Sequence, residues 1–370
     1  MSRKGMNIYH RKDGRWEGRY IKEKADGKTK YGYVYGKSYN EVMGKLSNKA
    51  LLKTKKGAEN STFACSASDW LVLIKPQLKP ASIARYTNIL NLYLLPQFGK
   101  QSIVEISRSD VYNFANELLT SGGAHSNGLA PKTVNSILSV VKIVFNYAAA
   151  EKGYSVANIK NICVKQPLKQ PRVLSKAEQQ KLSSYLKDNP TPCNLGILLS
   201  LYTGMRIGEV CALKWKDINF ADQCIYVHHA MQRIQLLDNP CQKTAVQILA
   251  PKSECSIRYI PILSNLLPLL EHQKKCDDAF VLTGSEKKYI EPRCLENHFK
   301  AVLAACDLKD INFHALRHTF ATRCIELGFD IKSLSEILGH SNVSITLNRY
   351  VHPSMELKQK NISMLSELFT

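Results

Sequence analysis

The chain has 370 residues and is strongly basic: 51 Lys and Arg stand against 31 Asp and Glu, which gives a net charge of +20 and a pI near 9.4. Such an excess of cations favours polyanionic partners, because each phosphate that is neutralised releases condensed counterions. The longest apolar run, near Leu195–Leu201, is too short to span a bilayer, so no membrane is expected as a partner.

The cysteines, the carboxylates and the first residues of the chain argue against several further classes of protein. The 11 cysteines are scattered without C-x-x-C pairs and their number is odd, which predicts reduced thiols rather than a disulfide framework or a zinc site. There is no cluster of Asp and Glu suited to two-metal phosphoryl chemistry, and the basic start of the chain has no apolar stretch typical of a signal peptide. The sequence therefore predicts a cytoplasmic protein that needs neither a metal nor another cofactor.

Residues 1–58 are predicted to form a small basic β module. Aromatic and polar residues alternate over 15–20 and 30–35, and Gly27 separates the two runs, which predicts a β-hairpin or small meander. Apolar residues then recur at helical spacing over 38–55. The first 60 residues carry 16 Lys or Arg and 6 Asp or Glu, so half of the net charge lies here. Both a DNA-binding surface and a solvated charged face would explain this charge.

Residues 62–165 predict four helices. The first two cover 62–74 and 82–94, the second ending before a proline. The third begins at Ser107, where an acidic residue three positions later completes a capping box. The fourth begins at Pro131, which suits the first turn of a helix, and ends at a glycine.

A connector rich in Pro and Lys, 166–172, leads into a second half that is predicted to be mainly helical. Ser175 begins its first helix with another capping box. Between Cys224 and Pro261 the pattern predicts a hairpin or a three-stranded sheet instead. The chain is therefore expected to be a multidomain protein, mainly α with small β parts.

An arginine follows directly after the longest apolar run. The run turns at Gly204, and a new helix carries Arg206 and Glu209. A buried arginine needs a counter-charge or a ligand phosphate, and its planar guanidinium suits phosphate because it donates two parallel hydrogen bonds. Pairing between Arg206 and Glu209 across one helical turn is the alternative that needs no ligand.

The segment from His314 to Tyr350 is the most informative part of the sequence. His314 and Arg317 are three residues apart, so they would share one face of a helix. Asp330 would cap a second short helix, which ends at a glycine and presents His340. Ten residues later comes Tyr350. A phenol beside a basic pocket suits attack on a phosphodiester whose non-bridging oxygens are held by Arg and His.

These motifs together resemble those of the tyrosine recombinases, the phage-integrase family, and most of all the integrases of conjugative transposons and prophages. The resemblance is firm over residues 173–355 and rests on arrangement alone in the N-terminal half. The catalytic residues that it implies are Arg206, Lys252, His314, Arg317, His340 and Tyr350, with Glu209 as an accessory acidic residue.

The family also places its catalytic lysine in a β-hairpin between the two arginine motifs. In this chain 248–253 leads through a turn into 256–261, which is the usual setting of that lysine. The resemblance therefore implies Lys252, and Lys243 is the competing choice.

The resemblance also implies how the domains bind DNA. Residues 1–58 resemble an arm-type DNA-binding domain, 62–165 a core-binding domain that clamps the duplex, and 173–370 a catalytic domain with a C-terminal tail. This tail carries an apolar stripe that would dock on a neighbouring subunit or on its own domain. The side chains expected to contact DNA are Arg15, Trp16, Arg19 and Tyr20 in the first domain and Lys79, Arg85, Lys132 and Lys142 in the second.

The implied function is site-specific recombination that integrates and excises a mobile element. Tyr350 would attack a phosphate and form a 3′-phosphotyrosine, and Lys252 would protonate the departing 5′-oxygen. The arginines and His340 would stabilise the phosphoryl charge, while His314 would assist as acid, base or orienting group. The implied partners are double-stranded DNA attachment sites, a homotetramer on DNA within the nucleoid, and excisionase-like and DNA-bending accessory proteins.

Two other functions remain open at this point. A type IB topoisomerase shares the Arg, Lys, Arg, His, Tyr chemistry, although the separate basic N-terminal module favours recognition of a site over relaxation of any duplex. A non-catalytic DNA-binding protein would need a lost catalytic residue, and all six positions are filled.

Overall fold

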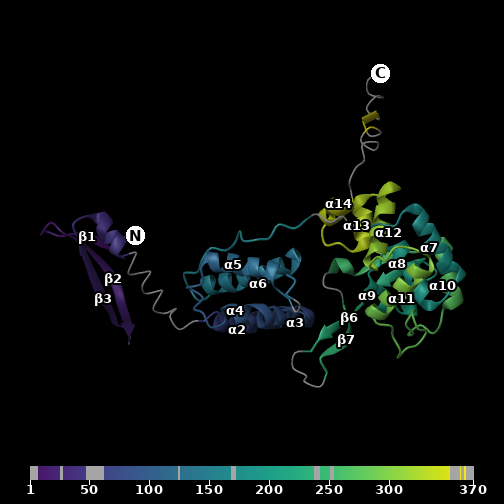
Figure 1. Cartoon of the computed structure of the whole chain (residues 1–370), viewed down its shortest axis with the longest axis horizontal. Helices are drawn as coiled ribbons and strands as arrows, with labels where there is room; N and C mark the ends of the chain where they lie inside the picture. The colour runs from purple at the N-terminus through teal and green to yellow at the C-terminus, as the bar shows by residue number, and fades with distance from the viewer. Residues whose placement is uncertain are drawn as a thin grey trace. The chain divides into compact units, whose positions relative to one another are not determined.

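The computed structural model divides the chain into two compact units, Met1–Pro167 and Leu168–Thr370 (Figure 1). Each unit has an apolar core of its own. The described residues are 7–25, 28–46, 62–123, 126–167, 172–236, 242–250, 254–350, 359 and 362–363. Lys252 and most of the predicted C-terminal tail therefore lie outside the described residues.

The first unit begins with a three-stranded antiparallel sheet, so the predicted meander is present. Its strands are β1 (Ile8–His10), β2 (Trp16–Ala25) and β3 (Lys28–Gly36), in the order β1-β2-β3. Residues 39–46 are helical, and Val42 in this segment is completely buried. A Cβ atom on Gly18 would lie 2.6 Å from Val42 Cγ1, so a glycine here allows the helical segment to approach β2 closely.

The rest of the first unit is a helical bundle. Its helices are α2 (Phe63–Ile74), α3 (Pro80–Ile89), α4 (Leu95–Phe98), α5 (Arg108–Thr120) and α6 (Pro131–Ala150). The predicted capping box is present, because Ser107 N donates to Asp110 Oδ2 at 2.8 Å and Asp110 N donates to Ser107 Oγ at 3.2 Å. The helices enclose one apolar core.

The predicted end of the second helix before Pro96 is wrong. The helix begins earlier, at Pro80, and continues beyond Ile89 through a π-helical turn, Leu90–Leu94, directly into α4. Pro96 lies in the first turn of α4. A proline lacks the N–H that a continuous α-helix would use there, and the change of hydrogen-bond register at the π-helical turn accommodates this loss.

Among the described residues, α6 is the one helix that is long and apolar enough to span a membrane by length and composition alone. Its apolar residues lie instead inside the bundle, where Val134, Ile137 and Val141 are completely buried. A helix that is buried by its neighbours in this way passes the same test of length and composition. We therefore assign α6 as the central helix of the bundle.

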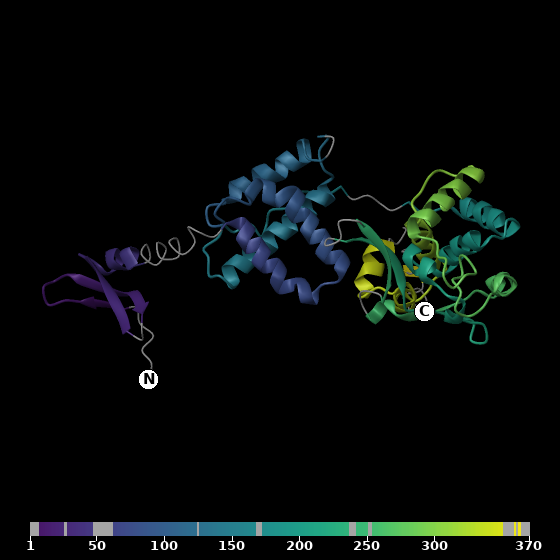
Figure 2. The ribbon, with the colours of Figure 1, turned by 90° about the horizontal axis from the view of Figure 1, so that it is seen from below.

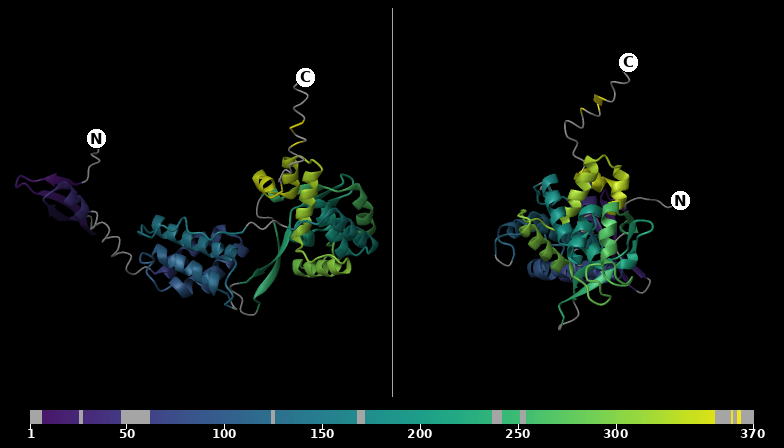
Figure 3. Two further views of the ribbon diagram at one scale, coloured as in Figure 1. Left: turned by 45° about the horizontal axis from the view of Figure 1, so that its top comes forward. Right: turned by 90° about the vertical axis from the view of Figure 1, so that its right-hand side faces the viewer.

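The second unit is mainly helical, as predicted. Its helices are α7 (Lys176–Asp188), α8 (Pro192–Thr203), α9 (Ile207–Ala212), α10 (Leu267–Gln273), α11 (Pro292–Ala305), α12 (His314–Glu326), α13 (Ile331–Leu338) and α14 (Val343–Tyr350). The long apolar run forms α8, which is buried along most of its length. Helices α12, α13 and α14 contact one another and gather at one end of the unit (Figure 3).

The strands of the second unit form both structures that the sequence allowed. A three-stranded sheet contains β4 (Ile218–Asn219), β5 (Cys224–Val227) and β8 (Arg258–Pro261). A separate hairpin contains β6 (Ala230–Gln235) and β7 (Thr244–Leu249), and Figure 2 shows this hairpin as two long teal-to-green strands.

The pairing of these strands corrects the expected setting of Lys252. Segments 248–253 and 256–261 do not form a hairpin with each other, because β7 pairs with β6 and β8 pairs with β5. Only 228–229 separate β5 from β6, whereas 250–257 separate β7 from β8. The predicted hairpin is therefore wrong, and the role of Lys252, which lies outside the described residues, stays a prediction.

Candidate active site

A sharp turn brings Arg206 and Glu209 to the edge of the core. Helix α8 ends at Gly204, whose φ of +69° is unfavourable for other residues. A Cβ atom there would also lie 2.7 Å from Phe320 and 2.8 Å from Leu338, so α12 and α13 pack directly against the turn. Arg206 follows as the N-cap of α9, and its guanidinium donates to Glu209 Oε1 at 2.7 Å. The ion pair that the sequence offered as an alternative is therefore present.

Glu209 also accepts hydrogen bonds from a second arginine, Arg258, which the sequence motifs did not single out. Arg258 Nη2 donates to Glu209 Oε2 at 2.9 Å, and Arg258 Nε donates to the carbonyl of Ile337 at 2.6 Å. Burial raises the pKa of the Glu209 carboxyl, but the charges of Arg258 and Arg206 outweigh burial and leave this pKa below its ordinary value. The signal for Arg258 was its position in β8, where it shares the buried face with Ile260.

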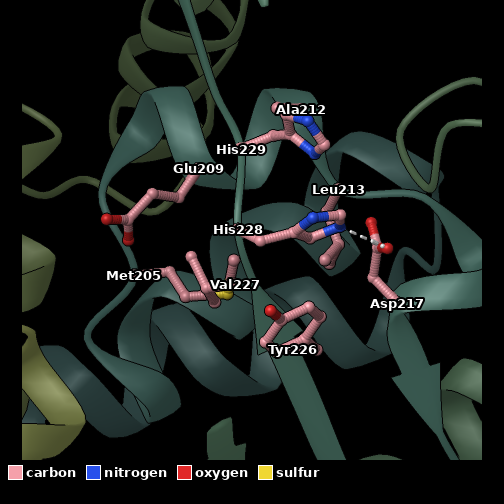
Figure 4. A pocket seen from close by; sticks show the side chains of 9 residues that line it. All are labelled: Met205, Glu209, Ala212, Leu213, Asp217, Tyr226, Val227, His228 and His229. Atoms are coloured by element: carbon pink, nitrogen blue, oxygen red, sulfur yellow. Dashed lines mark hydrogen bonds and ion pairs between the residues drawn. The ribbon is translucent and has the colours of Figure 1, made fainter. Parts of the chain in front are cut away.

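A small cavity lies beside Glu209 on the side of the three-stranded sheet (Figure 4). His228 lines it and lies with Nε2 2.9 Å from Asp217 Oδ1. The cavity has a volume of about 10 Å³, which is room for at most one water molecule. It is therefore a packing gap and not a ligand site.

Arg317 is the most deeply buried cation of the site. Its side chain is 1% exposed, and the guanidinium donates to the carbonyl of Gly204 at 2.8 Å and to that of Leu338 at 2.7 Å. These carbonyls lie at the C-terminal ends of α8 and α13, where helices leave carbonyls unpaired and carry partial negative charge. Burial and the nearby charge of Arg206 lower the pKa of Arg317 to about 9, so it stays charged at neutral pH.

His340 is presented by α13 as predicted. Asp330 accepts a hydrogen bond from Ser333 N at 2.8 Å at the start of this helix, and the helix ends at Gly339 with φ of +65°. His340 Nδ1 lies 2.8 Å from Thr346 Oγ1. Burial and the charges of the surrounding arginines lower the pKa of His340 to about 3, so its imidazole is neutral at physiological pH.

Tyr350 is the last residue of α14 and is 6% exposed. Its ring lies parallel to that of His340, with centroids 6.4 Å apart. Its hydroxyl lies 2.9 Å from Nδ1 of His318, a residue to which the sequence reasoning gave no role. Burial raises the pKa of Tyr350 above its ordinary value, although Arg317 and Arg349 act in the opposite direction. The phenol is therefore protonated at neutral pH.

The structure brings together five of the six residues implied as catalytic. Arg206 Nη2 donates to the carbonyl of Gly339 at 3.3 Å, beside His340, and His314 contacts His318 edge-on with centroids 4.6 Å apart. Lys243 is exposed at the end of the β6–β7 hairpin, where its carbonyl accepts from Leu236 N at 2.9 Å. The result is a cationic site with neutral imidazoles and a protonated phenol, which suits binding and attack of a phosphodiester.

The N-terminal sheet has two different faces. Gly18 and Gly36 face the helical segment 39–46, and the register places Trp16 and Tyr20 on this covered face. The opposite face carries Tyr31, Tyr33 and Tyr35, which are 40%, 47% and 43% exposed.

The predicted DNA-binding residues of this domain therefore do not share one surface. The Arg19 guanidinium lies 3.4 Å from the centroid of the Tyr31 ring, on the open face. Arg15 is exposed and bonded to Asp13 at 2.9 Å. Trp16 packs instead against Tyr39 with centroids 5.5 Å apart. The strict alternation along β3 was the signal for the open tyrosine face.

The four basic residues predicted to contact DNA from the helical bundle differ in exposure. Arg85 and Lys132 are exposed on α3 and α6, whereas Lys79, the N-cap of α3, and Lys142 on α6 are half-buried.

Comparison with known proteins gives a consistent result. The model of the phage integrase family matches residues 172–356, and that of the phage integrase N-terminal SAM-like domain matches 62–119. A tyrosine recombinase XerC-like protein of Caldanaerobacter subterraneus is 30% identical over 332 residues, which cover 81% of each chain. The ICEBs1 integrase of Bacillus subtilis is 25% identical over 327 residues, which cover 84% of each chain.

The fold is similar to that of the Tn1549 transposon integrase, solved in complex with a circular intermediate DNA. The TM-score is 0.67 at 21% identity, over 82% of this chain and 99% of that chain. These relatives are recombinases and integrases, and the topoisomerase alternative has no support among them.

Proposed function

Because this chain belongs to the phage integrase family and is a site-specific tyrosine recombinase that cuts and rejoins DNA to integrate and excise mobile DNA, we propose that Tyr350 is its nucleophile. One observation carries the proposal: the hydroxyl of the buried phenol lies 2.9 Å from His318 Nδ1, and its ring is parallel to that of His340 with centroids 6.4 Å apart. Attack on a DNA phosphate forms a 3′-phosphotyrosine and releases a 5′-hydroxyl. The phosphotyrosine keeps the energy of the broken bond for religation.

Arg206, Arg317 and His340 stabilise the charge that builds on the phosphoryl oxygens. Carbonyl groups bind two of the five N–H donors of Arg317 and hold its guanidinium before DNA arrives. Donors that are already oriented need no reorganisation during the reaction, which makes them effective for the transition state. Glu209 acts through Arg206 and fixes its guanidinium at 2.7 Å.

Lys252 protonates the departing 5′-oxygen, and His314 assists as acid, base or orienting group. Lys243 is the alternative general acid, and a substrate with a bridging 5′-phosphorothiolate separates the two. Its leaving sulfur needs no general acid, so it should restore cleavage to Lys252→Ala and leave Arg206→Ala inactive. Rescue of Lys243→Ala instead would move the role to that lysine.

The other domains bind the flanking DNA. We assign 1–58 as an arm-type domain, 62–165 as a core-binding domain and 173–370 as the catalytic domain with its C-terminal tail. The basic side chains of the first two contact phosphates. Four DNA strands are exchanged between two duplexes, so a homotetramer in the nucleoid, with excisionase-like and DNA-bending partners, is the assembly that we propose.

The main test is a suicide substrate that traps the covalent complex. Tyr350→Phe should abolish the protein–DNA adduct and leave DNA binding almost unchanged, since only the nucleophilic oxygen is lost. Tyr202→Phe is the matched control, because it removes another hydroxyl of this unit that lies 2.8 Å from Ser183 Oγ. A Tyr350→Phe protein that still traps DNA would disprove the assignment.

A further inference from the structure

His318 lies one turn after His314 on α12 and is only 7% exposed. Its Nδ1 atom lies 2.9 Å from the hydroxyl of Tyr350. Such a distance is that of a hydrogen bond between a phenol and an imidazole. Two residues 32 positions apart in sequence are thus in direct contact at the reacting oxygen.

The other imidazoles of the site are engaged differently. His340 Nδ1 lies 2.8 Å from Thr346 Oγ1, and His314 is exposed and contacts the ring of His318 edge-on. Among the described residues, His318 is therefore the histidine that shares a hydrogen bond with the Tyr350 hydroxyl.

The protonation states allow a proton to pass from the phenol to the imidazole. Burial, together with His314, Arg349 and Arg317, lowers the pKa of His318 to about 4, so the ring is neutral and one nitrogen accepts a hydrogen bond. A bound phosphodiester would bring negative charge to these cations and so favour the protonated imidazole.

His318 is also one of the residues that line a cavity of about 280 Å³. Charged residues face this cavity from two other segments: Arg172, paired with Glu178 at 3.0 Å, and Asp310, paired with Lys300 at 3.2 Å. A cavity of this size holds several water molecules. Water in this cavity, which His314 also lines, can therefore reach the His318 side chain.

We propose that His318 is the general base that accepts the proton of the Tyr350 hydroxyl. This inference rests on the proposed role of Tyr350. As the bond between Tyr350 Oη and phosphorus forms and the bond between phosphorus and the 5′-oxygen breaks, the phenolic proton moves to His318 Nδ1. In religation the 5′-hydroxyl returns its proton to the general acid, Lys252 in the proposed function, and its oxygen bonds to phosphorus. The bond between phosphorus and Oη breaks, and His318 returns the proton to the departing phenolate.

The test combines His318→Asn with difluorotyrosine at position 350. Asparagine keeps a polar group near the position of Nδ1 but cannot be protonated, so cleavage of the suicide substrate should fall by ~10²-fold or more. Difluorotyrosine ionises more easily than tyrosine and should restore much of that loss. Cleavage by His318→Asn should also increase with pH, because hydroxide then removes the proton, while the native protein shows a weaker dependence. His298→Asn is the matched control, since His298 lies 2.8 Å from Asn194 Oδ1, and should cleave normally.

The outcomes separate this inference from the proposed function. If His318→Asn loses the same fraction of its cleavage rate with tyrosine and with difluorotyrosine at every pH, His318 would have a structural role and the inference would be overturned. If difluorotyrosine restores cleavage to His314→Asn and not to His318→Asn, His314 would be the general base instead. If His318→Asn does not fold, His318→Ala with added imidazole gives the same decision, because rescue supports a base and its absence opposes one. Adduct formation by Tyr350→Phe would refute the proposed nucleophile itself.

Discussion

Arginine plays different roles in the N-terminal sheet and in the catalytic unit. On the sheet, Arg15 is 62% exposed and Arg19 lies over a tyrosine ring on the open face. In the catalytic unit, Arg317 and Arg258 are buried and held by backbone carbonyls or by Glu209.

The difference separates DNA affinity from catalysis. Exposed cations bind DNA mainly by releasing counterions, so their contribution depends on salt and is spread over many residues. Buried cations have already lost their hydration during folding and are fixed by several hydrogen bonds, so they act on the charge that develops in the reaction. We therefore expect substitutions in the sheet to change affinity, and substitutions in the catalytic unit to change rate and stability.

The largest effect is expected for Arg317→Lys. A lysine ammonium is a single point charge and does not reproduce the two fixed hydrogen bonds to the carbonyls of Gly204 and Leu338. Cleavage of a suicide substrate should fall by ~10²-fold or more, while affinity for the same DNA changes little. Arg323→Lys on the same helix is the control and should cleave at a nearly native rate. A parallel collapse of affinity and rate would make Arg317 a binding residue.

Glu209→Gln should mainly reduce stability. The substitution leaves Arg258 buried without its counter-charge, so the free energy of unfolding should fall by about 3 kcal/mol. Because the folded pKa of Glu209 is lowered, its contribution is complete above the ordinary value of 4.5 and is lost as the pH falls through the folded value.

Urea unfolding of the native protein and Glu209→Gln at several pH values measures both effects. The difference in free energy of unfolding between the native protein and Glu209→Gln should be constant at neutral pH and become smaller in acid. Glu178→Gln is the control, since Glu178 is paired with Arg172 at a more exposed site and should lose less than about 1 kcal/mol. A difference that grows in acid would contradict the assignment.

Arg19→Gln should weaken DNA binding without affecting cleavage. Loss of one phosphate contact should reduce the slope of log affinity against log salt by about 1 on full attachment-site DNA. Cleavage of a short core-site duplex should remain unchanged. Arg293→Gln, a substitution at an arginine that is 75% exposed in the catalytic unit, should leave the slope unchanged. An unaltered slope for Arg19→Gln would remove the open sheet face from the DNA interface.

The smallest effect is expected for Asp330→Ala. It removes the N-cap of α13 and should lower the free energy of unfolding by about 1 kcal/mol. Asp188→Ala at the C-terminal end of α7 should cause no loss, because an acidic residue is unfavourable there. Equal losses in thermal unfolding of the two variants would contradict the capping role.

Local chemistry made the helix boundaries predictable. Ser107, Ser175 and Asp330 begin helices as expected, because each satisfies backbone N–H groups within its own first turn. The predicted end of the second helix before Pro96 is wrong, because a π-helical turn lets the chain continue into α4 without a break. Nothing in the local sequence specifies that change of hydrogen-bond register.

Contacts between distant residues were much harder to predict. Arg258 reaches Glu209 from 49 positions away, and His318 reaches Tyr350 from 32. Both contacts depend on how α9, β8, α12 and α14 pack against one another, and the spacing of apolar residues in the sequence does not predict that packing. The predicted hairpin between β7 and β8 is wrong for the same reason. The two strands are neighbours in sequence, but β7 pairs with β6 and β8 pairs with β5.

The carboxylate of Glu209 accepts hydrogen bonds from both Arg206 and Arg258, and this sharing constrains how the protein can evolve. A change at position 209 alone would leave two guanidinium groups without their common partner. A viable lineage that loses the acid should therefore also replace Arg258 with a neutral residue of similar volume. Positions 209 and 258 are expected to covary among relatives, although β8 and α9 are far apart in the sequence.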